Sequence, residues 1–279
     1  MIIDCHTRVW ASPAQLGAGA DRWLAANGGQ PNLPADIGAH AAAAAPVART
    51  LVWGFRSRCV GGELPNSFVA DHVAQHADRM IGVAAVDPLE DDCLERLANI
   101  AQRPEFKAVT ISPAAQGFHP AHSLAWRVYE FCIERHLPVF VEPASTWGPP
   151  AVLEYARPAL LDEVCRSLPE LTLVVARAGW PWVDETLALL ARHERAFADI
   201  AGLPRRTWEC YQTLLTAHQR GLADRLLFGS DFPFSTPAQA IERLYRLGEM
   251  THGTSLPQVP REVLRSIVER DALAALGLA

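Results

Sequence analysis

Short apolar runs alternate with longer segments of helical spacing along the whole chain. Segments such as 123–136, 184–193 and 204–221 repeat their apolar positions every three or four residues, which predicts helices packed on one side. Strands that alternate with helices indicate βαβ units and a parallel sheet. Eight such strands predict an α/β protein with the closed (β/α)8 architecture of a TIM barrel. The predicted strands are residues 1–9, 49–55, 79–86, 106–112, 138–142, 171–176, 196–200 and 225–229.

Two segments interrupt this rhythm near the beginning of the chain. Residues 11–46 are rich in Ala, Gly and Pro, and residues 61–68 (GGELPNSF) follow the second predicted strand. Loops that follow strands form the active-site face of a barrel. Because residues 11–46 are long for a simple connector, we expect them to cover part of the mouth as a lid or wall. With no repeat or linker, residues 1–279 are expected to form a single barrel domain.

Charged side chains end several of the apolar strands. Alternation along the first strand is expected to place Asp4, His6 and Arg8 on one side. Each charged residue alone could be a turn residue, an exposed strand end or half of a structural ion pair, and a lone histidine could belong to the core. Together, on the face where parallel barrel strands converge, they indicate one shared polar site. The other three strand-end residues are Glu142, Arg177 and Asp231.

The composition of the chain disfavours some classes of binding partner. The formal net charge of the 279 residues is -6, and no basic run is present, which disfavours nucleic acid and anionic membranes. The sequence contains neither an apolar stretch long enough for a membrane span nor a secretion signal at its start. The six cysteines form no C-x-x-C pair, so we expect reduced thiols and a cytoplasmic location.

Five stretches of the chain carry a resemblance to a known family. They are MIIDCHTRVW, FKAVTISP, LPVFVEPAS, LPELTLVVARAGW and, most specifically, DRLLFGSDFPF. In these stretches the chain resembles the amidohydrolase-related family, in the branch that includes aminocarboxymuconate-semialdehyde decarboxylase and related lactonases. The resemblance extends over nearly the whole chain and implies a TIM barrel with hydrolase or decarboxylase activity.

Only some of the family's metal-binding residues are present in this sequence. The resemblance implies that two histidines of strand one, a histidine of strand five and an aspartate of strand eight hold a divalent metal. His6 and Asp231 match, as does the leading Asp4, whereas Arg8 and Glu142 replace the second and third histidines. Arg177 replaces the strand-six histidine that orients or activates water in typical members. Arginine offers only donors and stays protonated, so it cannot ligate a metal.

Three functions remain open from the sequence. The first is a hydrolase, lactonase-like, or a carbon–carbon lyase such as a decarboxylase, acting on a small carboxylated compound without tightly bound metal. The second is a metal-dependent hydrolase or decarboxylase in which His6, Glu142 and Asp231 hold an ion such as zinc. The third is a non-catalytic homologue in which the charges only stabilise the barrel mouth.

The first reading assigns a role to each candidate residue. Asp231 acts as general base, with His6 and Glu142 as the other catalytic groups, and no residue is a metal ligand. The substrate-binding group is expected to comprise Arg8, Arg177, Asp4, Trp180 and Trp147. Arginine forks bind carboxylates, and the tryptophans would wall a planar molecule. A homo-oligomer is compatible with the sequence, and the substrate itself is left open.

Overall fold

Eight parallel strands form the centre of the molecule, which a computed structural model describes over residues 1–30 and 33–278. They follow the order β1-β2-β5-β6-β7-β8-β9-β10, so each strand pairs with its neighbour along the barrel. Backbone N–H groups of Cys5 and Arg8 donate to Phe228 and Phe232, which joins the last strand to the first. The predicted TIM barrel is confirmed. The strands are β1 Ile3–Arg8, β2 Arg49–Trp53, β5 Met80–Ala85, β6 Phe106–Ile111, β7 Val139–Val141, β8 Leu173–Val175, β9 Ala196–Asp199 and β10 Leu226–Leu227.

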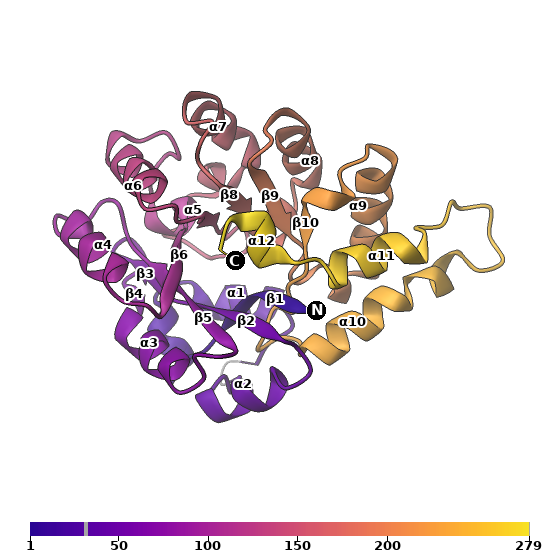
Figure 1. The fold of residues 1–279 in the computed structure, drawn as a ribbon, viewed down its shortest axis with the longest axis horizontal. Helices are drawn as coiled ribbons and strands as arrows, with labels where there is room; N and C mark the ends of the chain where they lie inside the picture. Colours follow the sequence, from indigo (N-terminus) through magenta and orange to yellow (C-terminus); the bar gives the residue numbers. More distant parts are fainter. Residues whose placement is uncertain (31–32, 279) are drawn as a thin grey trace.

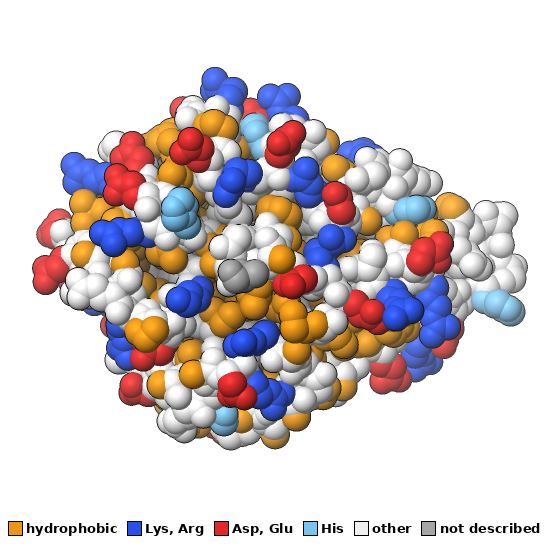
Figure 2. All heavy atoms as spheres, in the orientation of Figure 1, with side chains coloured by type: hydrophobic (Ala, Val, Ile, Leu, Met, Phe, Trp, Pro, Cys, Tyr) orange, Lys and Arg blue, Asp and Glu red, His pale blue; other side chains and the backbone are white. Residues whose placement is uncertain are grey.

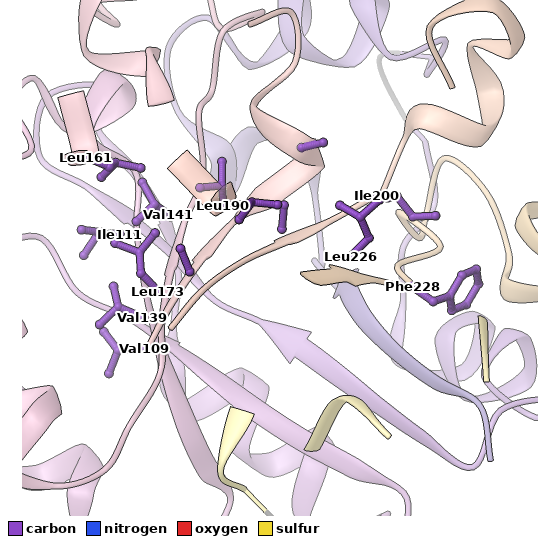
Figure 3. Close-up of a cluster of buried hydrophobic side chains, with 14 of the residues drawn as sticks. Val109, Ile111, Val139, Val141, Leu161, Leu173, Leu190, Ile200, Leu226 and Phe228 are labelled. Atoms are coloured by element: carbon purple, nitrogen blue, oxygen red, sulfur yellow. The ribbon is translucent and has the colours of Figure 1, made fainter. Parts of the chain in front are cut away.

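Helices surround the strands as an outer layer (Figure 1). Outward-facing residues of the strands, such as Val109 and Val141, pack with helix residues such as Leu190 in one apolar cluster (Figure 3). The predicted helices at 123–136, 184–193 and 204–221 are present as α6, α8 and α9. The helices are α1 Ala20–Ala26, α2 Ile37–Ala43, α3 Asn66–Ala74, α4 Cys93–Ala101, α5 Pro113–Gln116, α6 Ser123–Glu134, α7 Asp162–Ser167, α8 Val183–Arg192, α9 Thr207–Gln219, α10 Pro237–Tyr245, α11 Arg261–Val268 and α12 Ala272–Leu276.

The two ends of the barrel are covered by different parts of the chain. At the end where the strands begin, α12 lies across the ring (Figure 1) and contributes Leu273 and Leu276 to the cluster that contains Ile3 and Leu51. On this face acidic and basic side chains are interspersed (Figure 2). The opposite end, where the strands finish, is covered by α1 and the loops around it. No helix in the described parts of the chain is long and apolar enough to cross a membrane.

The strands are shorter than the apolar pattern indicates, and two of them depart from it in a way that matters for the site. The run 49–55 ends its barrel strand at Trp53, and the chain then forms a separate hairpin of β3 Phe55–Ser57 and β4 Gly62–Leu64. Part of 61–68, expected to be only a loop, therefore belongs to this hairpin. The expected strand 225–229 is regular only at Leu226–Leu227, because its last residues turn into the site.

Candidate active site

The end of β1 places three charged residues at the barrel mouth, but not by simple alternation. The register of β1 against β2 shifts between Asp4 and Thr7. Cys5 belongs to the barrel-interior cluster with Trp53, and His6 also stacks on the Trp53 ring with 4.0 Å between ring centres. The expected alternation of residues 4, 6 and 8 is therefore wrong at Asp4, because the irregularity intervenes.

Asp4 lies beside the last strand instead of joining the ion pairs. Its Oδ1 accepts hydrogen bonds from the backbone N–H groups of Ser230 and His6 at 2.8 and 3.2 Å. Its Oδ2 is buried without a hydrogen-bond partner among the described residues. Burial raises the pKa of Asp4 to about 6, with the Ser230 and His6 contacts opposing the rise. Asp4 therefore changes charge within a few units of neutral pH.

Arg8 and Glu142 form a buried bidentate ion pair. Arg8 Nη2 donates to Glu142 Oε2 at 2.8 Å, and Nη1 donates to Oε1 at 3.3 Å. Burial by itself raises the pKa of Glu142, but the charge and hydrogen bonds of Arg8, followed by the charge of Arg177, bring it below its usual value. Glu142 is therefore an ionised carboxylate with both oxygens engaged, and direct contact between an arginine and a carboxylate is confirmed.

Two arginines hold Asp231. Arg177 Nη2 lies 2.6 Å from Asp231 Oδ1, and Arg205 Nη2 donates to Oδ2 at 2.6 Å. Arg177 and Asp231 both have left-handed backbone conformations, with φ of 55° and 67°. Such conformations cost free energy and gather at functional sites. Gly202 allows the close approach, because a Cβ at that position would lie 3.0 Å from Asp231 Oδ2.

His6 pairs with Asp199, a residue at the end of β9. His6 Nδ1 lies 3.0 Å from Asp199 Oδ2, and Asp199 Oδ1 accepts from the backbone N–H groups of Arg177 and Ala201. A carboxylate fixed in this way can only accept, so Nδ1 of a neutral His6 carries the proton. The lone pair of Nε2 then remains, and this buried atom has no partner among the described residues. An imidazole oriented by a carboxylate with one free nitrogen is suited to general base catalysis.

Part of the segment 11–46, namely α1 and Asn27, covers this site, as expected. On α1, the Trp23 ring lies 5.7 Å from the guanidinium carbon of Arg8 and 5.5 Å from that of Arg177. Asn27, which follows α1, accepts hydrogen bonds from Arg177 and Arg205. The lid is therefore attached to the arginines of the site.

A small cavity lies beside the network. It has a volume of about 20 Å³ and is lined by Glu142, Arg177, Trp180, Arg206 and residues of the lid. The Arg206 guanidinium lies 4.3 Å from the Trp180 ring centre. Its own hydrogen bonds go to the Gly202 and Ala26 carbonyls and, at 3.4 Å, to the Asn27 side chain. Within the described residues Arg206 forms no ion pair, so its charge is available to an anion.

The two tryptophans proposed as walls lie in different surroundings. Trp180 lines the cavity. Trp147 stacks on Phe55, with ring centres 4.9 Å apart, and packs against Trp23 while its Nε1 donates to the Ala18 carbonyl. Trp147 therefore supports the lid from behind rather than lining the cavity.

The donor set does not suit a divalent cation. Across residues 1–30 and 33–278, no three His, Cys, Asp or Glu side chains are grouped so that they could hold a metal ion. His6, Glu142 and Asp231 are not brought together as ligands, because Glu142 is paired with Arg8 and Asp231 with two further arginines. Guanidinium groups at these positions repel a cation and offer it no lone pair. We therefore derive no chemical step through a metal.

Comparison with known proteins agrees with the barrel fold. The amidohydrolase family matches residues 3–278, and the chain belongs to this family. A search of curated protein sequences gives no match.

Solved structures show the same fold at low sequence identity. An uncharacterized TIM-barrel protein of Bordetella bronchiseptica is 21% identical, with a TM-score of 0.73 and 99% of both chains covered. A probable 2-pyrone-4,6-dicarboxylic acid hydrolase of Acinetobacter baumannii, with citric acid bound, is 16% identical, with a TM-score of 0.66 and 99% of both chains covered. The 5-carboxyvanillate decarboxylase of Novosphingobium aromaticivorans, with bound manganese, is 13% identical, with a TM-score of 0.68 and 100% and 97% of the two chains covered.

Proposed function

We propose that this chain is a lactonase-like hydrolase that acts on a small carboxylated compound without a tightly bound metal. The observation that carries the proposal is the Nε2 of His6, which has no partner among the described residues while Asp199 holds the other ring nitrogen. This assignment moves the role of general base from Asp231, where the sequence placed it, to His6. Asp231 has both oxygens engaged by guanidinium groups, so His6 is the better general base.

The carboxylate-binding part of the proposal rests on Arg206. Its charge lacks a carboxylate partner among the described residues and lies at the cavity beside Arg177. Burial lowers the pKa of Arg206, and the nearby positive charges of Arg205 and Arg177 lower it further by repulsion. An anionic substrate group relieves this repulsion, and a guanidinium fork binds a carboxylate in two hydrogen bonds. The names of two structural relatives, a dicarboxylic acid hydrolase and a carboxyvanillate decarboxylase, describe carboxylated compounds.

The residues support a simple hydrolytic sequence. His6 Nε2 takes a proton from a water molecule as the water oxygen forms a bond to the lactone carbonyl carbon. The charge that develops on the carbonyl oxygen is stabilised by the guanidinium groups of the network. The ring carbon–oxygen bond then breaks, and the protonated His6 returns its proton to the leaving oxygen. Glu142 keeps Arg8 in place through these steps.

Entry of a substrate requires movement of the lid. A cavity of about 20 Å³ holds about one water molecule. Trp23 and Asn27 on the lid fill the remaining space above the arginines. We therefore expect α1 to move away from the mouth when substrate binds.

The test is a turnover screen with protein washed with a chelator. Lactones that carry one or two carboxylates are compared with carboxylated phenols, following ring opening by absorbance and decarboxylation by carbon dioxide release. We expect ring opening and no carbon dioxide. The His6→Gln variant should lose at least about a hundredfold in kcat, whereas His218→Gln, which changes an exposed histidine of α9, should not.

Each other result favours one of the remaining functions. Zinc or manganese near one equivalent after the chelator wash would overturn the metal-free proposal. Carbon dioxide release would favour a decarboxylase. Absence of turnover with every compound would favour a non-catalytic homologue.

A further inference from the structure

A second buried polar cluster lies on the outer side of β1, directly behind the site. Thr7 stands between His6 and Arg8 in the sequence, and its hydroxyl oxygen lies 2.9 Å from His40 Nε2 on α2. His40 Nδ1 in turn lies 2.8 Å from His72 Nε2 on α3. Both histidines are 1% exposed. We call Thr7, His40 and His72 the histidine relay.

The hydrogen bonds allow one arrangement of protons. The Thr7 hydroxyl lies 2.7 Å from the Leu51 carbonyl, which can only accept, so the hydroxyl donates there. Thr7 must then accept from His40 Nε2–H, which leaves His40 Nδ1 as an acceptor. His72 Nε2–H consequently donates to His40 Nδ1. In this arrangement His40 is neutral, because a second proton on its Nδ1 would face the N–H of His72.

The relay contacts both segments that carry the site. Through Thr7 it is bonded to β1 at the point where the register against β2 has just shifted. The His40 ring also packs edge-on against Phe232, with ring centres 5.1 Å apart. Phe232 follows Asp231, and its carbonyl accepts from the Arg8 N–H at 3.0 Å. His40 therefore touches the two backbone segments whose relative position sets the distance between His6 and Asp231.

The surroundings keep the relay uncharged. The titratable groups that face His40 are His72 on α3 and His76 in the turn after it. β1 presents Thr7 and the segment after β10 presents Phe232, neither of which is charged. Burial, followed by these neighbouring histidines, lowers the pKa of His40 to about 3, and burial with His76 lowers that of His72 to about 4. Near neutral pH the relay is therefore a fixed hydrogen-bonded chain.

From this geometry we infer that Thr7, His40 and His72 are positioning residues for the active site. They hold the irregular end of β1 and the segment after Asp231 in register, so that His6 and Arg8 keep their places. The effect on catalysis rests on the proposed function. The effect on the position of His6 can be measured without turnover. A relay of this kind acts through β1 and touches no substrate.

The experiment uses nitrogen-15 histidine labelling of the full chain and NMR of the imidazole nitrogens. We expect His40 and His72 to carry their protons on Nε2 and to show no titration between pH 8 and 5.5, because this range lies above their lowered pKa values of about 3 and about 4. His40→Phe and Thr7→Val should both shift the His6 resonances, because each breaks the chain at a different bond. Thr7→Ser, which keeps the hydroxyl, and His76→Asn, which changes a ring packed on His72 outside the hydrogen-bonded chain, should leave them in place.

Two outcomes would overturn the inference. One is titration of His40 or His72 near the ordinary histidine value, and the other is an unchanged His6 spectrum in both relay variants. If His40→Phe fails to fold, the nearly isosteric Thr7→Val supplies the same readout. Where a substrate is found, kcat of the relay variants should fall about tenfold with KM nearly unchanged. Absence of turnover would contradict the proposed function and leave the NMR result to decide the inference.

Discussion

Two buried polar clusters lie on opposite sides of β1 and satisfy their hydrogen bonds in different ways. The mouth network of Arg8, Glu142, Arg177, Asp231 and Arg205 consists of full charges joined by ion pairs, with Asp231 shared by two arginines. The histidine relay consists of neutral groups in a directional chain. In the first cluster each charge faces an opposite charge, whereas in the second neutral donors face neutral acceptors.

This difference decides how each cluster responds to change. Loss of one partner from a buried ion pair leaves an uncompensated charge, which costs several times more than the loss of a neutral hydrogen bond. Mild acid is expected to affect the histidine relay more than the ion pairs. The carboxylate Glu142 has a lowered pKa and resists protonation in mild acid, but the buried histidines must remain neutral and are therefore sensitive to it.

The largest effect is expected from Arg8→Met. The variant leaves Glu142 buried without its bidentate partner, so the free energy of unfolding at pH 7 should fall by about 3–5 kcal/mol. The stranded carboxyl is then expected to have a raised pKa and to take up a proton. Unfolding in urea measures the loss. Arg96→Met is the control, because its ion pair with Asp92 is 40% and 46% exposed and should contribute less than about 1 kcal/mol.

A double variant sharpens this prediction. Arg8→Met combined with Glu142→Leu removes both charges, and apolar replacement of a buried pair is often neutral or stabilising. The double variant should therefore recover most of the lost stability. A single Arg8→Met variant within about 1 kcal/mol of the parent would show that Glu142 is not buried as a charge.

The next effect concerns pH. His40 and His72 have folded pKa values of about 3 and 4, below the ordinary 6.5, so the unfolded chain binds more protons between these limits. Stability is therefore fully present above pH 6.5 and falls with acidification by about 1.4 kcal/mol per pH unit for each histidine. Asp4 acts with the opposite sign, because its pKa is raised to about 6 and its neutral form stabilises the fold as pH falls from 6 toward 3.8. Below pH 6 the net loss should approach the slope of one histidine.

Urea unfolding at pH 7.5, 6.5, 5.5 and 5.0 tests this balance. His40→Phe removes one of the two histidine contributions, so its stability should depend on pH less steeply than that of the parent by up to about 1.4 kcal/mol per unit. Parallel pH profiles for the parent and the variant would show that His40 is not buried as a neutral group. His218→Gln on the surface should reproduce the parent profile.

The fold and the strand-end charges of the mouth could be predicted from the sequence, for a physical reason. Apolar runs that end in Glu142 or Arg177 have few explanations other than a shared polar site, and parallel strands bring their ends together. Asp199 satisfies the same criterion at the end of β9, where the weakly apolar run 196–200 carries the sequence signal for it.

The remaining members could not be found in this way. Arg205 and Arg206 lie in the loop after β9, and Trp23 and Asn27 on the lid, so their approach to the site depends on tertiary packing rather than on strand position. The register shift in β1 leaves no mark in an apolar pattern. The relay was also missed, because His40 and His72 lie on helices and a single sequence does not show that those helices meet behind β1.

The smallest effect is expected at the junction of the two clusters, from Thr7→Val. Valine keeps the shape of the side chain but removes the hydroxyl that accepts from His40 and donates to the Leu51 carbonyl. The Leu51 carbonyl and the His40 N–H both lose a partner, so the free energy of unfolding at pH 7 should fall by about 1–3 kcal/mol. The loss is at the lower end of this range if a water molecule binds to these two groups in place of the hydroxyl. Thr7→Ser retains the hydroxyl and should lose less than the valine variant, since it removes only a methyl group. Urea unfolding of the two variants in parallel separates the hydrogen bond from the packing, and a serine variant less stable than the valine variant would assign the stability at this position to the methyl group rather than to the relay.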